Sequence, residues 1–318
     1  MSTPGWGPRS GSSEPGWAPA RPGGPPPQGP PAGGFSGPTT CFQHPGRATG
    51  LRCARGGRPA CPECLREASV GFHCVVCVAE GRQQQRSATT VAGARLQPST
   101  PVVTYALMGA NVAVYLVTAV LARSLMGNDE SDVFARFALW PVGVAEGQWS
   151  RLLVSGFLHY GLLHLALNMY ALFVLGRELE TALGRLRYGA LYAVSLLGGS
   201  ASVMLFGEPT TVTVGASGAV FGLMGGLAVV LLKLRRSPVP VFTVIAINVV
   251  ISITVPGISL FGHLGGLVAG AVSAAALLYA PAGPRRAQLQ VVGLVALAVL
   301  LIVTVLLRVA QLRSDFGL

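Results

Sequence analysis

The stretch VGASGAVFG, residues 214–222, places Ser217 among glycines and alanines at the start of a strongly apolar segment. His263 stands near the start of another apolar segment, and His164 and Asn168 lie within a third. A serine hydroxyl beside a histidine base is an activated nucleophile for acyl transfer. These residue types therefore predict a nucleophilic site, provided that the apolar segments bring them together.

Acyl transfer also needs hydrogen-bond donors for the oxyanion that develops on the attacked carbonyl. The ring of His164, the amide of Asn168 and the backbone N–H of Ser217 at a helix N-terminus are the candidates. Asn168 follows His164 by four residues, so both side chains are expected on one face of a helix.

Two glycine stripes could bring the nucleophile and the base together. Each stripe repeats a small residue every fourth position, and such stripes let helix backbones approach closely. The stripes are Gly218, Gly222 and Gly226 in one segment and Gly262, Gly266 and Gly270 in the other. Simpler roles remain open at this point, because glycine stripes commonly serve packing alone and a serine inside the membrane commonly bonds its own backbone. A histidine and an asparagine on one face can also simply join two helices.

The elements that must position these residues are membrane-spanning helices. Of the 318 residues, 51% are hydrophobic and only 11% are charged, which is too apolar for a soluble domain of this size. Stretches of about 20 mainly apolar residues predict spans. Seven are expected, at 102–122, 151–175, 188–206, 215–233, 239–255, 259–280 and 289–309. The fold class is therefore an all-α polytopic membrane protein.

Basic residues orient the predicted spans, because cytoplasmic loops carry the excess of lysine and arginine. They cluster before the first span and after the second, fourth and sixth, whereas the loops at 207–214 and 256–258 have none. This alternation predicts a cytoplasmic N-terminus and a C-terminus outside. The net charge of +11 follows largely from this bias and from the basic N-terminal region. This charge favours an anionic lipid surface over nucleic acid as a partner.

The polar residues that are missing from the spans exclude other enzyme classes. Asp129, Asp132 and Asp315 are all expected in loops or the tail, so the spans hold no aspartate pair. The sequence also lacks HExxH, which argues against a zinc hydrolase of that type within the membrane.

The remaining chain divides by composition. Residues 1–38 are rich in Pro, Gly and Ser and are expected to be disordered, because they cannot bury a core. A cysteine-rich segment at 39–80 and a linker at 81–100 precede the membrane domain at 101–310, and a short tail at 311–318 ends the chain.

All six cysteines lie between positions 41 and 77, in a region expected to face the reducing cytoplasm. Pairs separated by two residues suit tetrahedral zinc, because two thiolates of one tight turn reach the same ion. The eight candidate ligands, enough for two sites, are Cys41, His44, Cys53, Cys61, Cys64, His73, Cys74 and Cys77.

This segment resembles a cross-braced, B-box-like zinc finger. The resemblance implies a first site made of the first and third pairs, Cys41, His44, Cys61 and Cys64. The second site would hold Cys53, Cys74 and Cys77, because Gly56 stands at the expected position of its fourth ligand. His73 is the possible substitute. One or two structural zinc ions are therefore expected, and the finger is a candidate binding site for a cytoplasmic protein.

The membrane domain resembles the rhomboid family of intramembrane serine proteases over about residues 102–310. Four motifs carry the resemblance in the family's order: GQWSR, HYGLLHLALN, GASGAVFG and GHLGG. It implies a six-helix core with a seventh helix after it and cleavage of transmembrane segments by a Ser–His dyad near the outer face. No cofactor is implied for catalysis.

The resemblance also implies roles for single residues. Ser217 would be the nucleophile and His263 the base. His164, Asn168 and the backbone at Ala216 and Ser217 would bind the oxyanion. The residues expected to line the site are His159, Phe221 and Gly215. For His159, snorkelling toward the membrane surface is an equal alternative.

The expected substrates are single-span membrane proteins in the plasma membrane. Two other classes stay open. A rhomboid-like pseudoprotease or scaffold would bind membrane proteins without cutting them, although it would be expected to lack Ser217 or His263. A transporter would normally show charged residues within the spans or broken helices.

Overall fold

The computed structural model describes residues 39–84, 89–94 and 100–318. The chain forms two compact units, residues 1–86 and 87–318, which are described separately. The predicted disordered tail at 1–38 lies outside the described residues.

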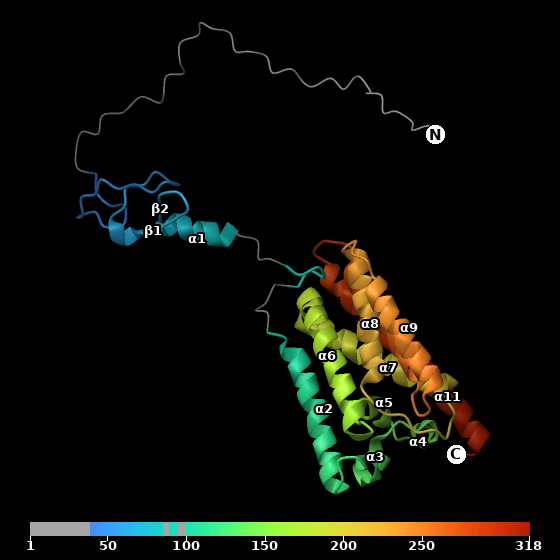
Figure 1. The fold of residues 1–318 in the computed structure, drawn as a ribbon. Helices are drawn as coiled ribbons and strands as arrows, with labels where there is room; N and C mark the ends of the chain where they lie inside the picture. Colours follow the sequence, from blue (N-terminus) through green and yellow to red (C-terminus); the bar gives the residue numbers. More distant parts are fainter. Residues whose placement is uncertain (1–38, 85–88, 95–99) are drawn as a thin grey trace, which may run out of the picture. The chain divides into compact units, whose positions relative to one another are not determined.

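The second unit is a bundle of apolar helices (Figure 1). Five of them are long and apolar enough to span a membrane: α2 (Val102–Leu121), α6 (Gly161–Leu183), α7 (Arg185–Phe206), α10 (Leu260–Tyr279) and α11 (Arg286–Phe316). Two shorter apolar helices, α8 (Ser217–Lys233) and α9 (Val239–Thr254), complete the seven predicted segments. The helical, multi-pass membrane architecture predicted from composition is confirmed.

The second span begins ten residues later than predicted. Residues 151–157 form the short helix α5 (Arg151–Val154) and a 3₁₀ turn (Ser155–Phe157) instead of the first turns of α6. The reason is Arg151, which is buried and donates to the backbone oxygens of Ala135 and Ala138 at 3.0 and 2.5 Å. These bonds hold the segment in the connection between α2 and α6. His164 consequently lies in the first turn of α6.

That connection also contains a 3₁₀ turn (Asn128–Glu130) and the short helices α3 (Asp132–Phe137) and α4 (Pro141–Ala145). The buried side chain of Asn128 ties it to both long helices. Its amide donates to Thr118 of α2 at 3.0 Å and to the His159 carbonyl at 2.8 Å, and its oxygen accepts from the Gly161 N–H at 2.9 Å. Asn128 therefore fixes the residues that lead into α6.

Glu180, near the end of α6, caps the start of α2. Its carboxylate accepts from the N–H groups of Val103 and Thr104 at 3.0 and 2.9 Å and from the Thr104 hydroxyl at 2.8 Å. The first N–H groups of a helix have no partner within it, so a buried carboxylate satisfies them and also suits the positive end of the helix dipole. Arg185 lies 3.8 Å from the same carboxylate.

Helices α7, α8 and α10 form the tightly packed centre of the bundle. A Cβ atom built on Gly222 would stand 2.9 Å from the backbone oxygen of Gly266, and one on Gly218 would stand 3.2 Å from that of Gly262. On α7, a Cβ on Gly199 would stand 2.9 Å from the Gly262 oxygen. The two predicted glycine stripes therefore face each other, and α7 packs against the same line on α10.

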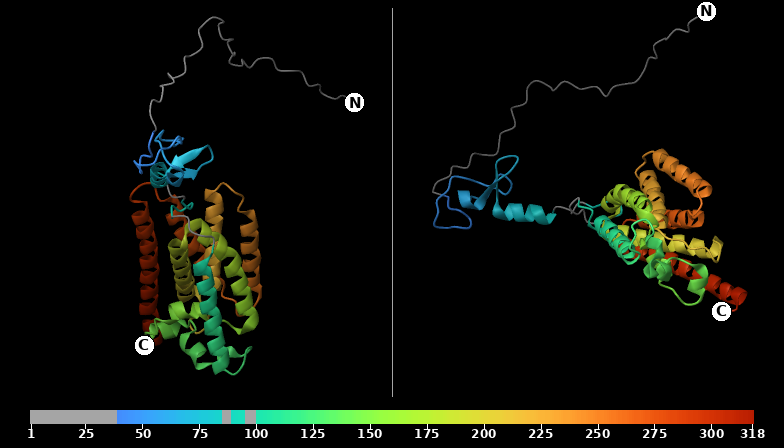
Figure 2. Two further views of the ribbon diagram at one scale, coloured as in Figure 1. Left: turned by 90° about the vertical axis from the view of Figure 1, so that its left-hand side faces the viewer. Right: turned by 60° about the horizontal axis from the view of Figure 1, so that its bottom comes forward.

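Helix α11 packs against α7 and α10 and runs along one side of the bundle (Figure 2, red). It continues to Phe316, so Asp315 lies in a helix and not in the predicted tail at 311–318. Arg308 and Arg313, on the same helix, each donate to a backbone oxygen, of Met204 at 3.1 Å and of Ala145 at 2.7 Å. These bonds tie the last turns of α11 to its neighbours.

The first unit, described from residue 39, is small and irregular. A 3₁₀ turn (Pro62–Cys64) leads into the antiparallel strands β1 (Leu65–Glu67) and β2 (Phe72–Cys74), and α1 (Val75–Gln84) follows. All six cysteines are buried, and together with Ala60 and Leu65 they form its core. A core of so few apolar side chains is too small to stabilise a domain by itself. A bound metal ion or another cross-link is therefore expected.

The close packing at the glycine stripes predicts that a larger residue there lowers the melting temperature. Leucine at position 266 would place its side chain against the backbone of Gly218, and overpacking of this kind costs about 1–3 kcal/mol or more. We expect Gly266→Leu to lower the melting temperature of the purified protein in detergent by at least roughly 5 °C. Gly109→Leu is the matched control, because a Cβ at this helical glycine meets no atom within 4 Å. Equal melting temperatures for the two variants would contradict the packing.

Candidate active site

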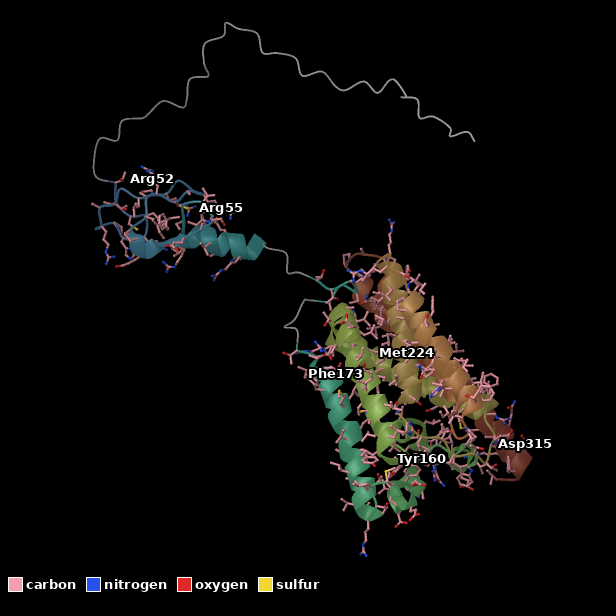
Figure 3. The ribbon with its side chains drawn as sticks, in the orientation of Figure 1. Arg52, Arg55, Tyr160, Phe173, Met224 and Asp315 are labelled. Carbon is pink, nitrogen blue, oxygen red and sulfur yellow. The ribbon has the colours of Figure 1, made fainter. Side chains whose placement is uncertain are left out.

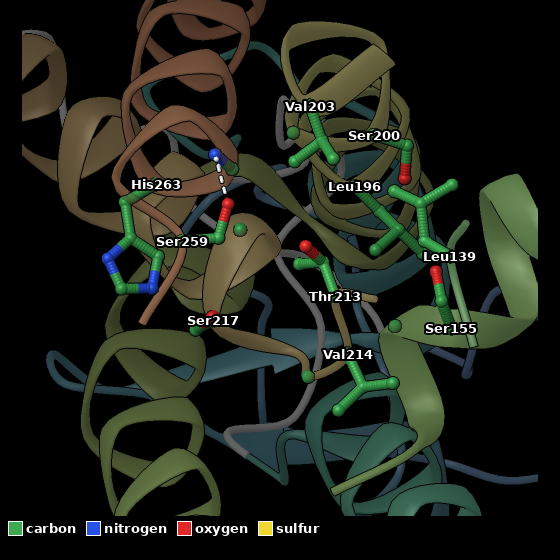
Figure 4. A pocket seen from close by; sticks show the side chains of 15 residues that line it. Leu139, Ser155, Leu196, Ser200, Val203, Thr213, Val214, Ser217, Ser259 and His263 are labelled. Carbon is green, nitrogen blue, oxygen red and sulfur yellow. Dashed lines mark hydrogen bonds between the residues drawn. The ribbon is translucent and has the colours of Figure 1, made fainter. Parts of the chain in front are cut away.

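The predicted site residues come from the N-terminal ends of three helices. Ser217 is the first residue of α8, where the N–H groups of the first turn have no partner within the helix. His263 is buried in the first turn of α10, whose N-cap Ser259 accepts from the Gly262 N–H at 3.1 Å (Figure 4, dashed line). His164 lies in the first turn of α6.

Ser217 and His263 both line two cavities. The smaller one has a volume of about 30 Å³ and also contains the hydroxyl-bearing residues Ser155, Ser200, Thr213 and Ser259 (Figure 4). This is enough room for a water molecule among polar partners. The larger cavity, of about 720 Å³, is lined as well by His164 and Asn168. The structure thus brings all four residues of the predicted constellation to one cavity.

The larger cavity is bounded by α6, α8, α9 and α10, and most of its wall is apolar. Leu163 and Leu167 come from α6, Met224 from α8 and Ile251 from α9. Figure 3 labels Met224 and also Tyr160, which precedes α6 and lines the same space. Its volume falls in the range of ligand pockets, in which apolar walls surround a few placed polar groups.

The ring of His263 is held on two sides. It stacks on Phe221, with ring centroids 4.1 Å apart and planes 12° from parallel, and its Nδ1 lies 2.7 Å from the Ser252 hydroxyl. Ser252 directs its single hydroxyl proton to the Asn248 carbonyl at 2.7 Å. Nδ1 of His263 must therefore be the donor to Ser252, which leaves the lone pair of a neutral imidazole on Nε2.

Ser252 is not among the residues predicted from the sequence. It is the buried residue of α9, a helix that is described in full. The available signal was the pair Asn248 and Ser252, two polar residues four positions apart in an apolar helix. A serine in such a helix commonly bonds only its own backbone, so the sequence does not predict the contact between Ser252 and His263.

His164 is held with its proton on the other nitrogen. Its Nδ1 accepts from the Tyr160 N–H at 3.3 Å, so the proton of a neutral ring is on Nε2. A Cβ built on Gly215 would stand 2.9 Å from this Nε2 and 3.6 Å from the Ser217 hydroxyl oxygen. Nε2 of His164 and the hydroxyl oxygen of Ser217 therefore both lie close to the position that a side chain at residue 215 would occupy. Gly215 itself has φ +123°, and this conformation and the lack of space both favour glycine.

The other predicted residues differ in how they meet the cavity. The Asn168 amide lines it but gives one hydrogen to the His164 carbonyl at 3.0 Å, which leaves one for a ligand. His159 is fully buried, which disfavours snorkelling, and its ring meets that of His164 edge-on at 5.0 Å instead of lining either cavity. Ala216, the N-cap of α8, is also buried, and its carbonyl accepts from Val220 at 2.9 Å.

In the first unit, Cys41, His44, Cys61 and Cys64 form one possible metal-binding group. Nδ1 of His44 lies 3.8, 3.5 and 3.4 Å from the three sulfurs in turn. A tetrahedral zinc ion with ordinary bond lengths requires N–S edges of about 3.5 Å, so the four ligand atoms fit zinc. Burial raises the pKa of the Cys41 thiol, but hydrogen bonds with the backbone of Cys61 and Gln43 and with His44 lower it to about 6 overall.

Cys53, Cys74 and Cys77 form the second group, and His73 does not join it. His73 and Cys74 are neighbours on β2, and successive side chains of a strand point to opposite faces. With Cys74 turned into the core, His73 is directed away from it and is half-exposed.

Comparison with known proteins identifies the family to which the chain is similar. Residues 146–280 match the family model described as the Rhomboid domain. The chain is 37% identical over 162 residues to Rhomboid protease GluP of Bacillus subtilis. The aligned segment covers 49% of this chain and 32% of that protein. It is 36% identical to RHOMBOID-like protein 4 of Arabidopsis thaliana, over 41% of this chain and 34% of that protein.

The fraction of each relative's length that this chain covers differs among the relatives. The chain spans between 32% and 51% of the length of five curated relatives that include these two. It covers 67% of Putative rhomboid protease YdcA of Bacillus subtilis, at 35% identity over 41% of this chain. The motifs, the helical bundle and these matches agree, and the chain belongs to the rhomboid family.

Proposed function

We propose that this protein is a serine endopeptidase that cleaves transmembrane segments of membrane proteins with a Ser217–His263 dyad. The observation that carries the proposal is the pair of contacts made by the Ser252 hydroxyl, with the Asn248 carbonyl and with Nδ1 of His263. Because Nδ1 donates to Ser252, Nε2 holds a lone pair in the same cavity as the Ser217 hydroxyl. A base in this state is what a serine nucleophile needs.

The proposed reaction follows from these positions. The Ser217 oxygen attacks the scissile carbonyl carbon while Nε2 of His263 takes the hydroxyl proton. The same proton then passes to the leaving amine, and an acyl-enzyme remains. A water molecule, for which the smaller cavity has room, then gives a proton to Nε2 and attacks the ester carbon. The ester C–O bond breaks, Nε2 returns the proton to the Ser217 oxygen, and the new carboxyl end is released.

The oxyanion formed in each attack needs donors. In this proposal they are Nε2–H of His164, the free amide hydrogen of Asn168 and the N–H of Ser217 at the start of α8. His164 is the best placed of the side chains, because its Nε2 and the serine oxygen lie against the same point beside Gly215.

The substrate would enter the larger cavity, whose apolar wall suits a transmembrane segment. A single-span protein with a locally unwound helix fits the requirement that the scissile bond reach the N-terminal ends of α6, α8 and α10. The basic loops favour a cytoplasmic N-terminus and an outer location of these ends in the plasma membrane, with the C-terminus outside.

The cysteine-rich unit is proposed to hold a structural zinc ion through Cys41, His44, Cys61 and Cys64. The fit of the N–S distances to a tetrahedral ion supports this assignment. Zinc would supply folding energy there and take no part in proteolysis. The unit is then free to bind a cytoplasmic protein.

The dyad predicts the effect of two substitutions. Ser217→Ala and His263→Ala should each lower the turnover of a single-span reporter in liposomes by at least roughly 10³-fold, because each removes one half of a unit. The double variant should be no worse than either single variant. Melting temperatures within a few degrees of wild type would exclude unfolding as the cause. Turnover by Ser217→Ala at a rate close to that of wild type would overturn the assignment.

The donors predict smaller losses. His164→Ala and Asn168→Ala should each reduce kcat by roughly 10- to 1000-fold with little change in KM, since an oxyanion exists only in the transition state. The loss should be greater for His164, because one amide hydrogen of Asn168 already belongs to a helix carbonyl. Wild-type kcat in both variants would mean that these side chains only join helices.

Ser252 is predicted to be a positioning residue. Ser252→Ala removes the acceptor of Nδ1, so the tautomer of His263 is no longer fixed. We expect kcat to fall by roughly 10- to 100-fold, a part of what a general base contributes, with KM unchanged. Ser252→Thr keeps the hydroxyl and should restore most of the rate.

The matched control for Ser252 is Thr243→Ala on the same helix. Thr243 also donates to the carbonyl four residues earlier, at 3.0 Å, but is exposed. This variant should match wild type. If Ser252→Ala and Thr243→Ala behave alike, the contact with His263 has no catalytic role.

A further inference from the structure

The second cysteine group is as buried as a protein core. The sulfurs of Cys53, Cys74 and Cys77 lie within 4.8 Å of one another, and the three residues are at most 4% exposed. The Cys53 sulfur accepts from the N–H groups of Gly56 and Cys74 at 3.3 and 3.1 Å. Backbone N–H groups directed at a sulfur favour its thiolate form, which is the form that binds metals.

The fourth ligand is the feature that separates this group from the first. Among the described residues, no other cysteine, histidine or carboxylate joins the three sulfurs. Every other ligand pair in the unit has a second ligand three residues after the first, and at this spacing after Cys53 stands Gly56. A Cβ at position 56 would stand 2.8 Å from the Cys77 sulfur and 3.9 Å from that of Cys53. Any side chain at 56 would therefore point into the group, and glycine supplies none.

The charges indicate what kind of ligand completes the group. The first group has three sulfurs and a neutral imidazole nitrogen, so with Zn²⁺ its net charge is −1. Three thiolates and Zn²⁺ in the second group already give −1. A neutral ligand from outside the chain would make the two sites alike. Gly56 is exposed, so the backbone that covers the sulfurs lies at the surface.

We propose that Cys53, Cys74 and Cys77 hold a second zinc ion whose fourth ligand is a water molecule that a neutral nitrogen donor can displace. Three protein ligands and one water is the arrangement of zinc sites that exchange ligands, whereas four protein ligands make a closed structural site. The unit would thus combine one closed and one open zinc site. The class of ligand that the open site takes is an imidazole, such as a histidine side chain of a partner.

The test uses the full-length protein in detergent, with zinc replaced by Co²⁺ as a spectroscopic probe. We expect two metal ions per chain by elemental analysis. Imidazole should change the visible absorption of the cobalt protein in a saturable way, because it replaces water on one ion. This readout does not depend on proteolysis, so it can fail or succeed independently of the proposed dyad.

Position 56 offers a variant that closes the site without removing a ligand. Gly56→Cys adds a fourth thiolate, after a small movement of the Cys77 sulfur, so two metal ions should remain while the response to imidazole disappears. Gly50→Cys is the matched control. A Cβ there meets no atom within 4 Å, so the extra thiol lies away from both groups and the response should stay as in wild type.

Three results would overturn the proposal. One metal ion per chain in the wild type would mean that the three thiols bind none. Two ions without any response to imidazole would mean that the fourth ligand is fixed. An equal response in Gly56→Cys and wild type would place the exchangeable position elsewhere.

Discussion

The close approach of the α8 and α10 backbones is the constraint on which the rest of the membrane unit depends. Gly218, Gly222 and Gly266 lie where a Cβ would press on the opposite backbone, so no other residue keeps this separation. In a bilayer the hydrophobic effect does not drive helices together, and packing of this kind must do so. Ser217 and His263 stand at the adjoining ends of these two helices, so the distance between the glycine stripes also sets the distance between the two side chains.

Buried polar side chains fix helix ends and a side-chain orientation that the glycine packing does not determine. Asn128 holds the entry to α6, Glu180 caps α2 and Ser252 holds the ring of His263. Each is buried, and each has its hydrogen-bonding groups directed at named partners, as a low-dielectric interior requires. None of the three carries the proposed chemistry. They determine instead where the reactive groups point.

Features of this chain that follow from a periodic sequence pattern could be predicted, whereas features that depend on a single contact between distant residues could not. The stripes of α8 and α10 follow from spacing alone, and in the structure they face each other beside a cavity that Ser217 and His263 both line. The start of α6 was misplaced because the apolar run after Arg151 resembles a span, while the two carbonyls that hold its guanidinium come from residues 135 and 138. Likewise, the strand that turns His73 away from the sulfurs is set by pairing with β1, which ligand spacing does not reveal.

In the proposed mechanism, the two histidines of the larger cavity have opposite roles. A neutral imidazole has one donor and one acceptor nitrogen, and its surroundings decide which is which. Ser252 takes the Nδ1 proton of His263, so Nε2 remains a base, whereas the Tyr160 N–H occupies Nδ1 of His164, so Nε2 remains a donor. A base and an oxyanion donor are the two functions that acyl transfer by a serine requires. The proposed roles of the two histidines therefore depend on one hydroxyl group on α9 and one backbone N–H before α6. If His263 accepted a hydrogen bond at Nδ1 and His164 donated one there, the same two residues could not perform these roles.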